Sequence, residues 1–119
     1  MRVMMQYYHA LVAHVDREVG RLVESLERQG LRDDTIFVFS SDHGEQLGNH
    51  GFVEKGYFYE ESVRVPCVVS WPSRLPREMR VSTPLAGVDL MPTLLDLTGG
   101  RAPERIDGRS LAADLLAAR

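Results

Sequence analysis

The stretch from Thr35 to Ser40 places the strongest constraint on the fold, because it is an unbroken β-rich run that is apolar on both faces. Such a strand is typical of a parallel sheet that helices cover on both sides. A second run of this kind extends from Pro66 to Trp71. Because two strands make only a thin sheet, the sequence predicts an α/β fold that forms part of a larger sheet.

A long helix is predicted before the first strand. From about Val3 to Gln29, apolar residues recur at helical spacing and charged residues fall on the other side. Gly30 suits a left-handed C-terminal cap, and Asp33 and Asp34 follow it as a turn. The predicted order is therefore a long helix, then buried parallel strands with covering helices.

Two shorter helices are predicted towards the end of the chain. Asp89 can cap a helix that ends at Gly99, and Ser110 can cap a last helical piece through Leu116. No repeat and no internal domain boundary is visible within residues 1–119.

Composition excludes several classes of protein. Apolar residues make up 44% of the chain and charged residues 26%, as in ordinary globular proteins. The formal net charge of -3 gives no field that would favour nucleic acid. No apolar stretch approaches the roughly 20 residues that span a bilayer. One cysteine, Cys67, excludes an internal disulfide, and its apolar surroundings predict a buried thiol.

A carboxylate and an imidazole stand side by side after the first strand, at Asp42 and His43. Open α/β sheets bind their ligands beyond the carboxyl ends of strands, and both side chains are common metal ligands. Gly44 permits the sharp turn that would aim both at one ion. Two ligands are too few for a metal site, so the others must come from other sequence. The alternative interpretation is a polar turn that ends a strand.

A short glycine-bearing loop then returns a second histidine and a lysine. Lys55 is a compact charge on a long stem and suits a phosphate or sulfate oxygen. His50 could donate to the same anion or act as a general acid. Gly48 and Gly51 keep the loop tight enough to bring these groups back. The alternative is that Lys55 is simply solvated.

The longer pattern closely resembles the second metal-binding segment of sulfatases, which belong to the alkaline-phosphatase-like superfamily. The resemblance covers nearly the whole chain. It rests on Tyr7-Tyr8, Val15-Asp16, Gly20, Ser41-Asp42-His43-Gly44-Glu45, Leu47-Gly48-Asn49-His50-Gly51, Lys55, Glu60-Glu61-Ser62-Val63-Arg64-Val65-Pro66, Val88-Asp89-Leu90-Met91-Pro92-Thr93-Leu94-Leu95 and Asp107-Gly108-Arg109-Ser110-Leu111. The implied fold is a partial alkaline-phosphatase-like sandwich, with residues 1–119 as the C-terminal part of a catalytic domain.

This resemblance implies a role for each polar residue of the central loop. Asp42 and His43 are metal ligands, Lys55 contacts the sulfate ester and acts in catalysis, and His50 has a supporting catalytic role. The family metal is usually Ca²⁺, although the imidazole of His43 also suits Mn²⁺ or Zn²⁺. Phosphonate and phosphodiester hydrolases of the superfamily share the Asp-His pair.

The resemblance also implies what the chain lacks. Sulfatases carry a formylglycine nucleophile, made from the first residue of a Cys/Ser-x-Pro-x-Arg motif, together with an early Asp-Asp metal pair. We expect both in the N-terminal half of the domain, which would be the partner of this chain. The segment Ser70-Trp71-Pro72-Ser73-Arg74 matches the motif by letter, but it follows the Asp-His segment, and Pro76 indicates a loop instead of a helix. We interpret it as a strand end and a turn.

The predicted function is that of a fragment of a metal-dependent sulfatase that hydrolyses sulfate monoesters, inactive as this chain alone. The alternatives are a phosphonate or phosphate ester hydrolase of the same superfamily and a non-catalytic truncated fragment. Further candidates have ordinary structural explanations. These are His9 and His14, which do not share a helix face, the possible pocket or core residues Tyr57, Phe58 and Tyr59, and Arg64, which could pair with Glu60 or Glu61.

Overall fold

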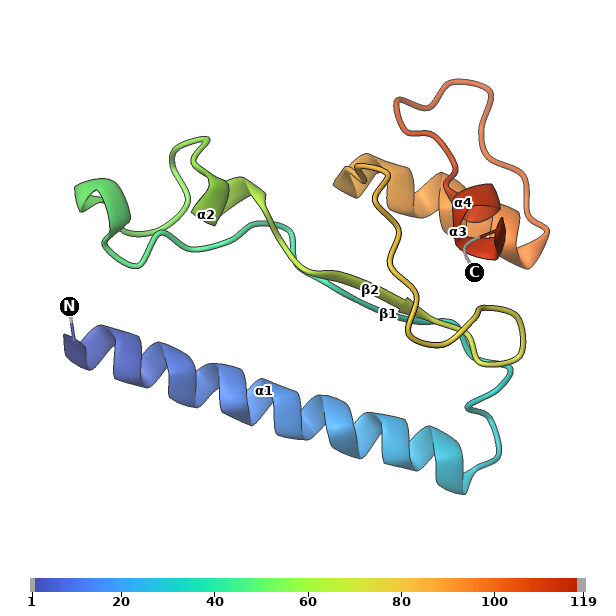
Figure 1. Cartoon of the computed structure of the whole chain (residues 1–119), viewed down its shortest axis with the longest axis horizontal. Helices are drawn as coiled ribbons and strands as arrows, with labels where there is room; N and C mark the ends of the chain where they lie inside the picture. The colour runs from blue at the N-terminus through green and yellow to red at the C-terminus, as the bar shows by residue number, and fades with distance from the viewer. Residues whose placement is uncertain (1, 118–119) are drawn as a thin grey trace. The chain divides into compact units, whose positions relative to one another are not determined.

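The computed structural model describes residues 2–117, which form two compact units that divide between Trp71 and Pro72. Figure 1 shows the elements in chain order. The first unit contains α1 (Arg2–Arg28), β1 (Phe37–Ser40), the 3-10 turn η1 (Asn49–Gly51), α2 (Glu60–Val63) and β2 (Cys67–Ser70). The second contains the 3-10 turn η2 (Gly87–Asp89), α3 (Leu90–Thr98) and α4 (Ala112–Ala117).

The predicted long helix is confirmed as α1, and its C-terminal cap lies where the glycine predicts it. Gly30 has a φ of +67°. Its N–H donates to the carbonyl oxygen of Glu27, and the N–H of Leu31 donates to that of Leu26, each at 3.0 Å. This pair of bonds is a Schellman motif, which satisfies carbonyl groups that the end of a helix leaves without partners.

The apolar side of α1 is uncovered within its own unit. No residue of the helix is buried, and Leu11, Val15 and Leu22 are each more than half exposed. Because amphipathic helices are stabilised mainly by burying their apolar face, we expect α1 to depend on packing that the described residues do not supply. Within residues 2–117, no helix combines the length and the apolar character needed to cross a bilayer.

The prediction of parallel strands is wrong for the two strands of this unit. β1 and β2 pair antiparallel, with Phe37 opposite Ser70 and Ser40 opposite Cys67. The chain leaves β1 and enters β2 at the same end of the pair. A parallel pair needs a crossover to the opposite end, usually through a helix, whereas this connection contains only the turn η1 and the short helix α2. The apolar composition of a strand does not determine its direction.

The expected burial of Cys67 is also wrong, because this cysteine is exposed. Val68, next to it in β2, is 53% exposed. Among the described elements, β1 contacts only β2, so no helix covers either face of the pair. An apolar run predicts a strand that can be buried, but the cover must come from other elements.

The second unit is organised by hydrogen bonds around the start of α3. The carboxylate of Asp89 accepts from the backbone N–H of Ala86 at 2.8 Å and from that of Arg109 at 2.9 Å. Thr93 Oγ1 donates to the Asp89 carbonyl at 2.6 Å and accepts from the N–H of Leu111 at 3.0 Å. Asp89 stands at the N-cap position as predicted, but its side chain makes no capping bond. It links the start of α3 to the segment that precedes α4.

The ends of the shorter helices agree with the sequence prediction. Gly99 ends α3 with a φ of +75°, and Ser110 Oγ accepts from the N–H of Ala112 at 3.2 Å, at the start of α4. The buried apolar side chains among the described residues include Leu75, Leu97, Leu111 and Ala112.

We expect the second unit to lose stability in acid through Asp89. The N–H groups of Ala86 and Arg109 hold the pKa of Asp89 below its ordinary value of 3.8, although partial burial opposes them. Because the pKa of Asp89 is lowered in the folded state, its stabilisation is complete at pH values above the ordinary pKa. The stabilisation is lost as the pH falls through the lowered pKa of the folded state. We would follow the NMR methyl signals of the buried Leu97 and Leu111, which report whether the second unit is folded, as the pH falls from about 6 to about 2.

Asp89→Asn is the matched variant for this prediction. An amide keeps one acceptor oxygen but turns an NH₂ group towards a backbone donor. The variant should therefore be less stable at neutral pH and should lack the acid transition that Asp89 causes. The same transition in both proteins would assign it to another carboxyl group.

Candidate functional site

The connection between β1 and β2 carries every residue that the sequence predicts for the site. Its two ends are held together, because Ser40 pairs with Cys67 and Ser40 Oγ donates to the carbonyl oxygen of Pro66 at 3.0 Å. Residues 41–66 therefore leave the strands and return to them at one place.

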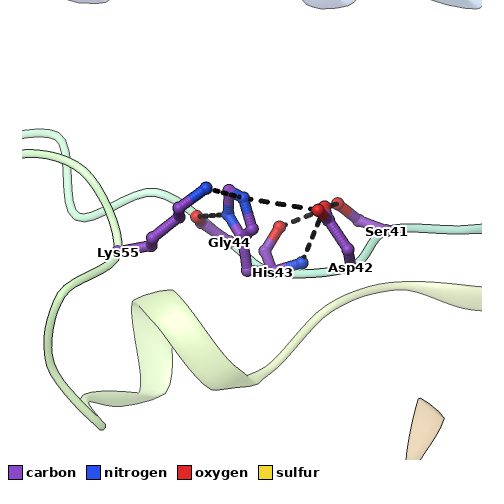
Figure 2. A network of polar contacts seen from close by, with 5 residues as sticks. All are labelled: Ser41, Asp42, His43, Gly44 and Lys55. Carbon is purple, nitrogen blue, oxygen red and sulfur yellow. Dashed lines mark hydrogen bonds and ion pairs between the residues drawn. The ribbon is translucent and has the colours of Figure 1, made fainter.

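The first turn of this connection aims Asp42 and His43 towards the same region (Figure 2). Ser41 Oγ donates to the His43 carbonyl at 2.7 Å, and the His43 N–H donates to Asp42 Oδ1 at 3.0 Å. Next, the Gly44 N–H donates to the Ser62 carbonyl at 2.8 Å, which fixes the turn to α2. The adjacent carboxylate and imidazole thus converge because short local bonds fold the backbone between them.

Gly44 is required for close packing and not for an unusual φ. Its φ is not among the positive values of this chain, in contrast to Gly48 at +92° and Gly51 at +78°. A Cβ atom at Gly44 would overlap the backbone carbonyl oxygen of Glu61. The sequence prediction that glycine permits a sharp turn therefore gave the wrong reason for this residue.

Gly44→Ala should lower the free energy of unfolding by about 1–3 kcal/mol, the usual range for overpacking. The reason is that α2 must move away from the turn. The measurement is urea denaturation of the chain, with Gly56→Ala as the matched control, since a Cβ at Gly56 meets nothing within 4 Å. Equal effects of the two substitutions would show that the contact with Glu61 does not restrict the loop.

The protonation of the His43 ring follows from its two partners. Nδ1 lies 2.8 Å from the Gly44 carbonyl oxygen, and Nε2 lies 2.7 Å from Lys55 Nζ. A carbonyl oxygen can only accept and an ammonium group can only donate. His43 is therefore neutral, with its proton on Nδ1 and its lone pair on Nε2. A histidine held this way by a backbone carbonyl is arranged as a metal ligand.

Asp42 and His43 fit one metal ion. Asp42 Oδ2 lies 3.5 Å from His43 Nε2. When a cation binds two ligand atoms at about 2.0–2.5 Å and roughly at a right angle, those two atoms lie about 3–3.5 Å from each other. Desolvation would raise the pKa of Asp42, but the adjacent His43 ring, backbone N–H bonds and the ammonium group of Lys55 together lower it. The Asp42 side chain is 84% exposed, so its carboxylate is accessible to an ion.

The sequence predicts that Asp42 and His43 are two ligands of a larger set. Within residues 2–117, no group of three or more His, Cys, Asp or Glu side chains is placed to hold a metal. The expectation that further ligands come from other sequence remains a prediction.

His50 does not join Asp42, His43 and Lys55 in the structure. Its Nε2 lies 3.4 Å from Glu61 Oε1, and its ring stacks on that of Tyr59 with centroids 4.0 Å apart. The same oxygen of Glu61 accepts from Asn49 Nδ2 at 2.9 Å. The backbone N–H of Glu61, with Asn49 and His50, lowers the pKa of Glu61. His50 is held in the loop by a carboxylate and a ring.

The aromatic residues of the loop behave differently from one another. Tyr57 and Tyr59 gather around Phe52, with the Phe52 and Tyr57 centroids 4.0 Å apart. Phe58, between these two tyrosines in the sequence, is 98% exposed.

The loop also contains a residue that sequence reasoning missed. Glu45 Oε1 accepts from the backbone N–H of Leu47 at 3.1 Å and from that of Glu54 at 2.6 Å. Its position beside the Asp-His pair was visible in the sequence, but backbone hydrogen bonds across a loop leave no periodic signal.

The remaining candidates have structural explanations. The segment after Ser70 is a turn and opens no helix, as expected for a chance match to the formylglycine motif. Asp33 and Asp34 form a turn. The expected pairing of Arg64 is confirmed with Glu60 at 3.7 Å, and His9 and His14 are both exposed on α1.

Comparison with known proteins identifies the family. The Sulfatase family profile matches residues 2–100. The N-acetylglucosamine-6-O-sulfatase of Bacteroides thetaiotaomicron is 40% identical over 107 residues, which are 90% of this chain and 19% of that protein. This chain belongs to the sulfatase family.

Solved structures support the same fold. One, of a protein in complex with its substrate D-glucosamine-2-N,6-O-disulfate, matches with a TM-score of 0.84 and 39% identity over 89% of this chain and 22% of that one. The phosphonate monoester hydrolase of Silicibacter pomeroyi matches with a TM-score of 0.81 and 36% identity, over 88% and 21%. The predicted partial α/β fold of the alkaline-phosphatase-like superfamily is therefore confirmed. The chain spans about a fifth of the length of the curated relatives it matches.

Proposed function

We propose that residues 1–119 are the C-terminal part of the catalytic domain of a metal-dependent sulfatase that hydrolyses sulfate monoesters. One observation carries this proposal. Asp42 Oδ2 and Lys55 Nζ both lie near the unprotonated Nε2 of His43, at 3.5 Å and 2.7 Å. A hard anionic ligand, a neutral imidazole and a mobile cation are the groups needed beside a bound metal and its anionic substrate.

Asp42 and His43 would hold the divalent cation in this proposal. When bound, such a cation polarises the ester and helps to form the nucleophile. Asp42 contributes charge, and His43 contributes a lone pair that the Gly44 carbonyl keeps on Nε2. We propose Ca²⁺ as the ion, with Mn²⁺ or Zn²⁺ as the alternatives that the imidazole ligand suits. The formylglycine nucleophile would belong to the N-terminal part of the domain.

Lys55 would bind the sulfate group. Its ammonium donates to His43 Nε2 in the structure, and its four-carbon stem allows it to turn to a sulfuryl oxygen. There it would offset the negative charge that develops in the transition state. His50 would support this region of the site from its position between Glu61 and Tyr59.

The direct test restores a complete catalytic domain. We would replace the matching segment of the N-acetylglucosamine-6-O-sulfatase with this chain and call the product the sulfatase chimera. If the proposal is right, the chimera retains its metal, measured by elemental analysis, and hydrolyses an aryl sulfate. A folded chimera without metal and without turnover would favour a non-catalytic segment.

A phosphonate or phosphate ester hydrolase is the second candidate, favoured by the similarity to the phosphonate monoester hydrolase. Assaying the chimera with aryl sulfate and aryl phosphonate, beside the parent enzyme, separates the two. A ratio of rates that moves towards the phosphonate would support this candidate over the sulfatase.

The 119-residue chain alone should show no turnover of aryl sulfates or aryl phosphates. It should also bind calcium weakly, because two ligands must order a loop for few bonds gained. Isothermal calorimetry and a spectrophotometric assay check both expectations. Submicromolar calcium binding, or turnover that Asp42→Ala abolishes, would contradict them.

A further inference from the structure

The loop that carries Lys55 contains three non-glycine residues with positive φ, and two of them share a hydrogen-bond partner. Leu47 has a φ of +50° and Glu54 a φ of +68°. For residues with a side chain, this left-handed conformation costs roughly 1–2 kcal/mol each. Such residues persist only where their surroundings hold them.

One carboxylate oxygen holds both positions. Glu45 Oε1 accepts from the N–H of Leu47 at 3.1 Å and from the N–H of Glu54 at 2.6 Å. Hydrogen bonds from backbone N–H groups to a carboxylate are stronger than those between neutral groups. The interaction spans the whole glycine-bearing part of the loop, from its start to the residue before Lys55.

The carbonyl side of Glu54 is fixed as well. The N–H of Gln46 donates to the Glu54 carbonyl at 3.0 Å. Gln46 is fully buried, and its Nε2 donates to Ser62 Oγ in α2 at 3.1 Å. Residue 54 is therefore held at both of its peptide groups, and the backbone of Lys55 starts from a fixed point.

We propose that Glu45 is the positioning residue for Lys55. It determines where the lysine stem begins, and thus whether Nζ reaches His43 Nε2 and the anion beside it. The assignment deepens the proposed function and rests on it for the role of Lys55. Glu45 acts through the Glu54 peptide, and its carboxylate neither binds the metal nor touches the substrate.

The experiment uses three substitutions at position 45 in the sulfatase chimera. Glu45→Gln keeps an acceptor oxygen at the same reach, Glu45→Asp keeps the charge but shortens the reach, and Glu45→Ala removes both. The alanine and aspartate variants should lower kcat/KM about tenfold to a hundredfold, as expected for a displaced catalytic group. The glutamine variant should stay within about threefold of the parent, and all three should keep their metal.

The matched control is Glu60→Ala. Glu60 belongs to the same connection, but its carboxylate only pairs with Arg64 on the surface, at 3.7 Å. This variant should keep the rate of the parent. Loss of metal from Glu45→Ala would overturn the proposal, because it would make Glu45 part of the metal site.

A double-mutant cycle separates positioning from a general structural role. In a Lys55→Ala background, Glu45→Ala should change the rate by less than about threefold, since the group that it positions is already gone. A merely structural residue would have the same effect in both backgrounds, and that result would contradict the proposal.

Amide hydrogen exchange provides a readout that is independent of sulfate hydrolysis. Glu45→Ala should lower the protection of the Glu54 N–H at least about tenfold, while Glu45→Gln preserves it. Unchanged protection in the alanine variant overturns the inference even in an inactive chimera. Reduced protection in an inactive chimera would support the contact between Glu45 and Glu54. In that case the proposed function would be wrong, and the inference about Glu45 would stand.

Discussion

Asp42→Ala in the sulfatase chimera should remove the bound metal and the activity together. In the proposed site the substitution deletes a charged ligand, and a metal's contribution of several kcal/mol to the transition state corresponds to about a thousandfold in rate. His43 cannot compensate, because its Nε2 supplies a single lone pair. Elemental analysis beside the rate of aryl sulfate hydrolysis measures both effects in one preparation.

Asp34→Ala is the control for this prediction, because Asp34 is an exposed carboxylate in a turn. Asp42→Asn should be intermediate, since it keeps an oxygen ligand without the charge. A full complement of metal in Asp42→Ala would show that the carboxylate is not a ligand, whatever happens to the rate.

Lys55→Ala should have the opposite signature, with metal retained and rate lost. A cation that faces developing charge acts mostly in the transition state, so kcat should fall about a hundredfold to a thousandfold with little change in KM. Lys55→Arg should recover only part of the rate, because a planar guanidinium does not replace a compact ammonium.

The comparison of the two variants tests the division of roles. Loss of metal from Lys55→Ala would mean that the contact of its Nζ with His43 Nε2 is needed to form the metal site. A normal rate in the same variant would show that another cation meets the sulfate.

Much of the fold could be predicted because its signals are local. The periodicity of α1, the left-handed Gly30 and Gly99 and the turn at Asp33 each depend on a few neighbouring residues. The convergence of Asp42, His43 and Lys55 could be predicted as well, from the glycine-bearing loop and the resemblance to the sulfatase segment. The same reasoning wrongly grouped His50 with them.

The predictions that were wrong, and the contacts that were not predicted, concern features that depend on residues distant in the sequence. The direction of β2 is determined by the path of the connection, and the exposure of Cys67 by the absence of cover among the described elements. Asp89 bonds to Arg109, and Glu45 to Glu54, across loops without periodicity. The conformational freedom of glycine was likewise the predicted reason for Gly44. The structure shows that a glycine is needed there because the backbone of Glu61 packs against it.

The antiparallel pairing has a practical consequence for engineering. Because Ser40 stands opposite Cys67, the chain leaves the strands for the site and returns to them at two paired positions. Residues 41–66 therefore form a cassette with two adjacent junctions, and recombination there leaves the strand register unchanged. Libraries that exchange this cassette among relatives would vary the Asp-His pair, the lysine and the aromatic cluster together, while the residues on either side stay constant.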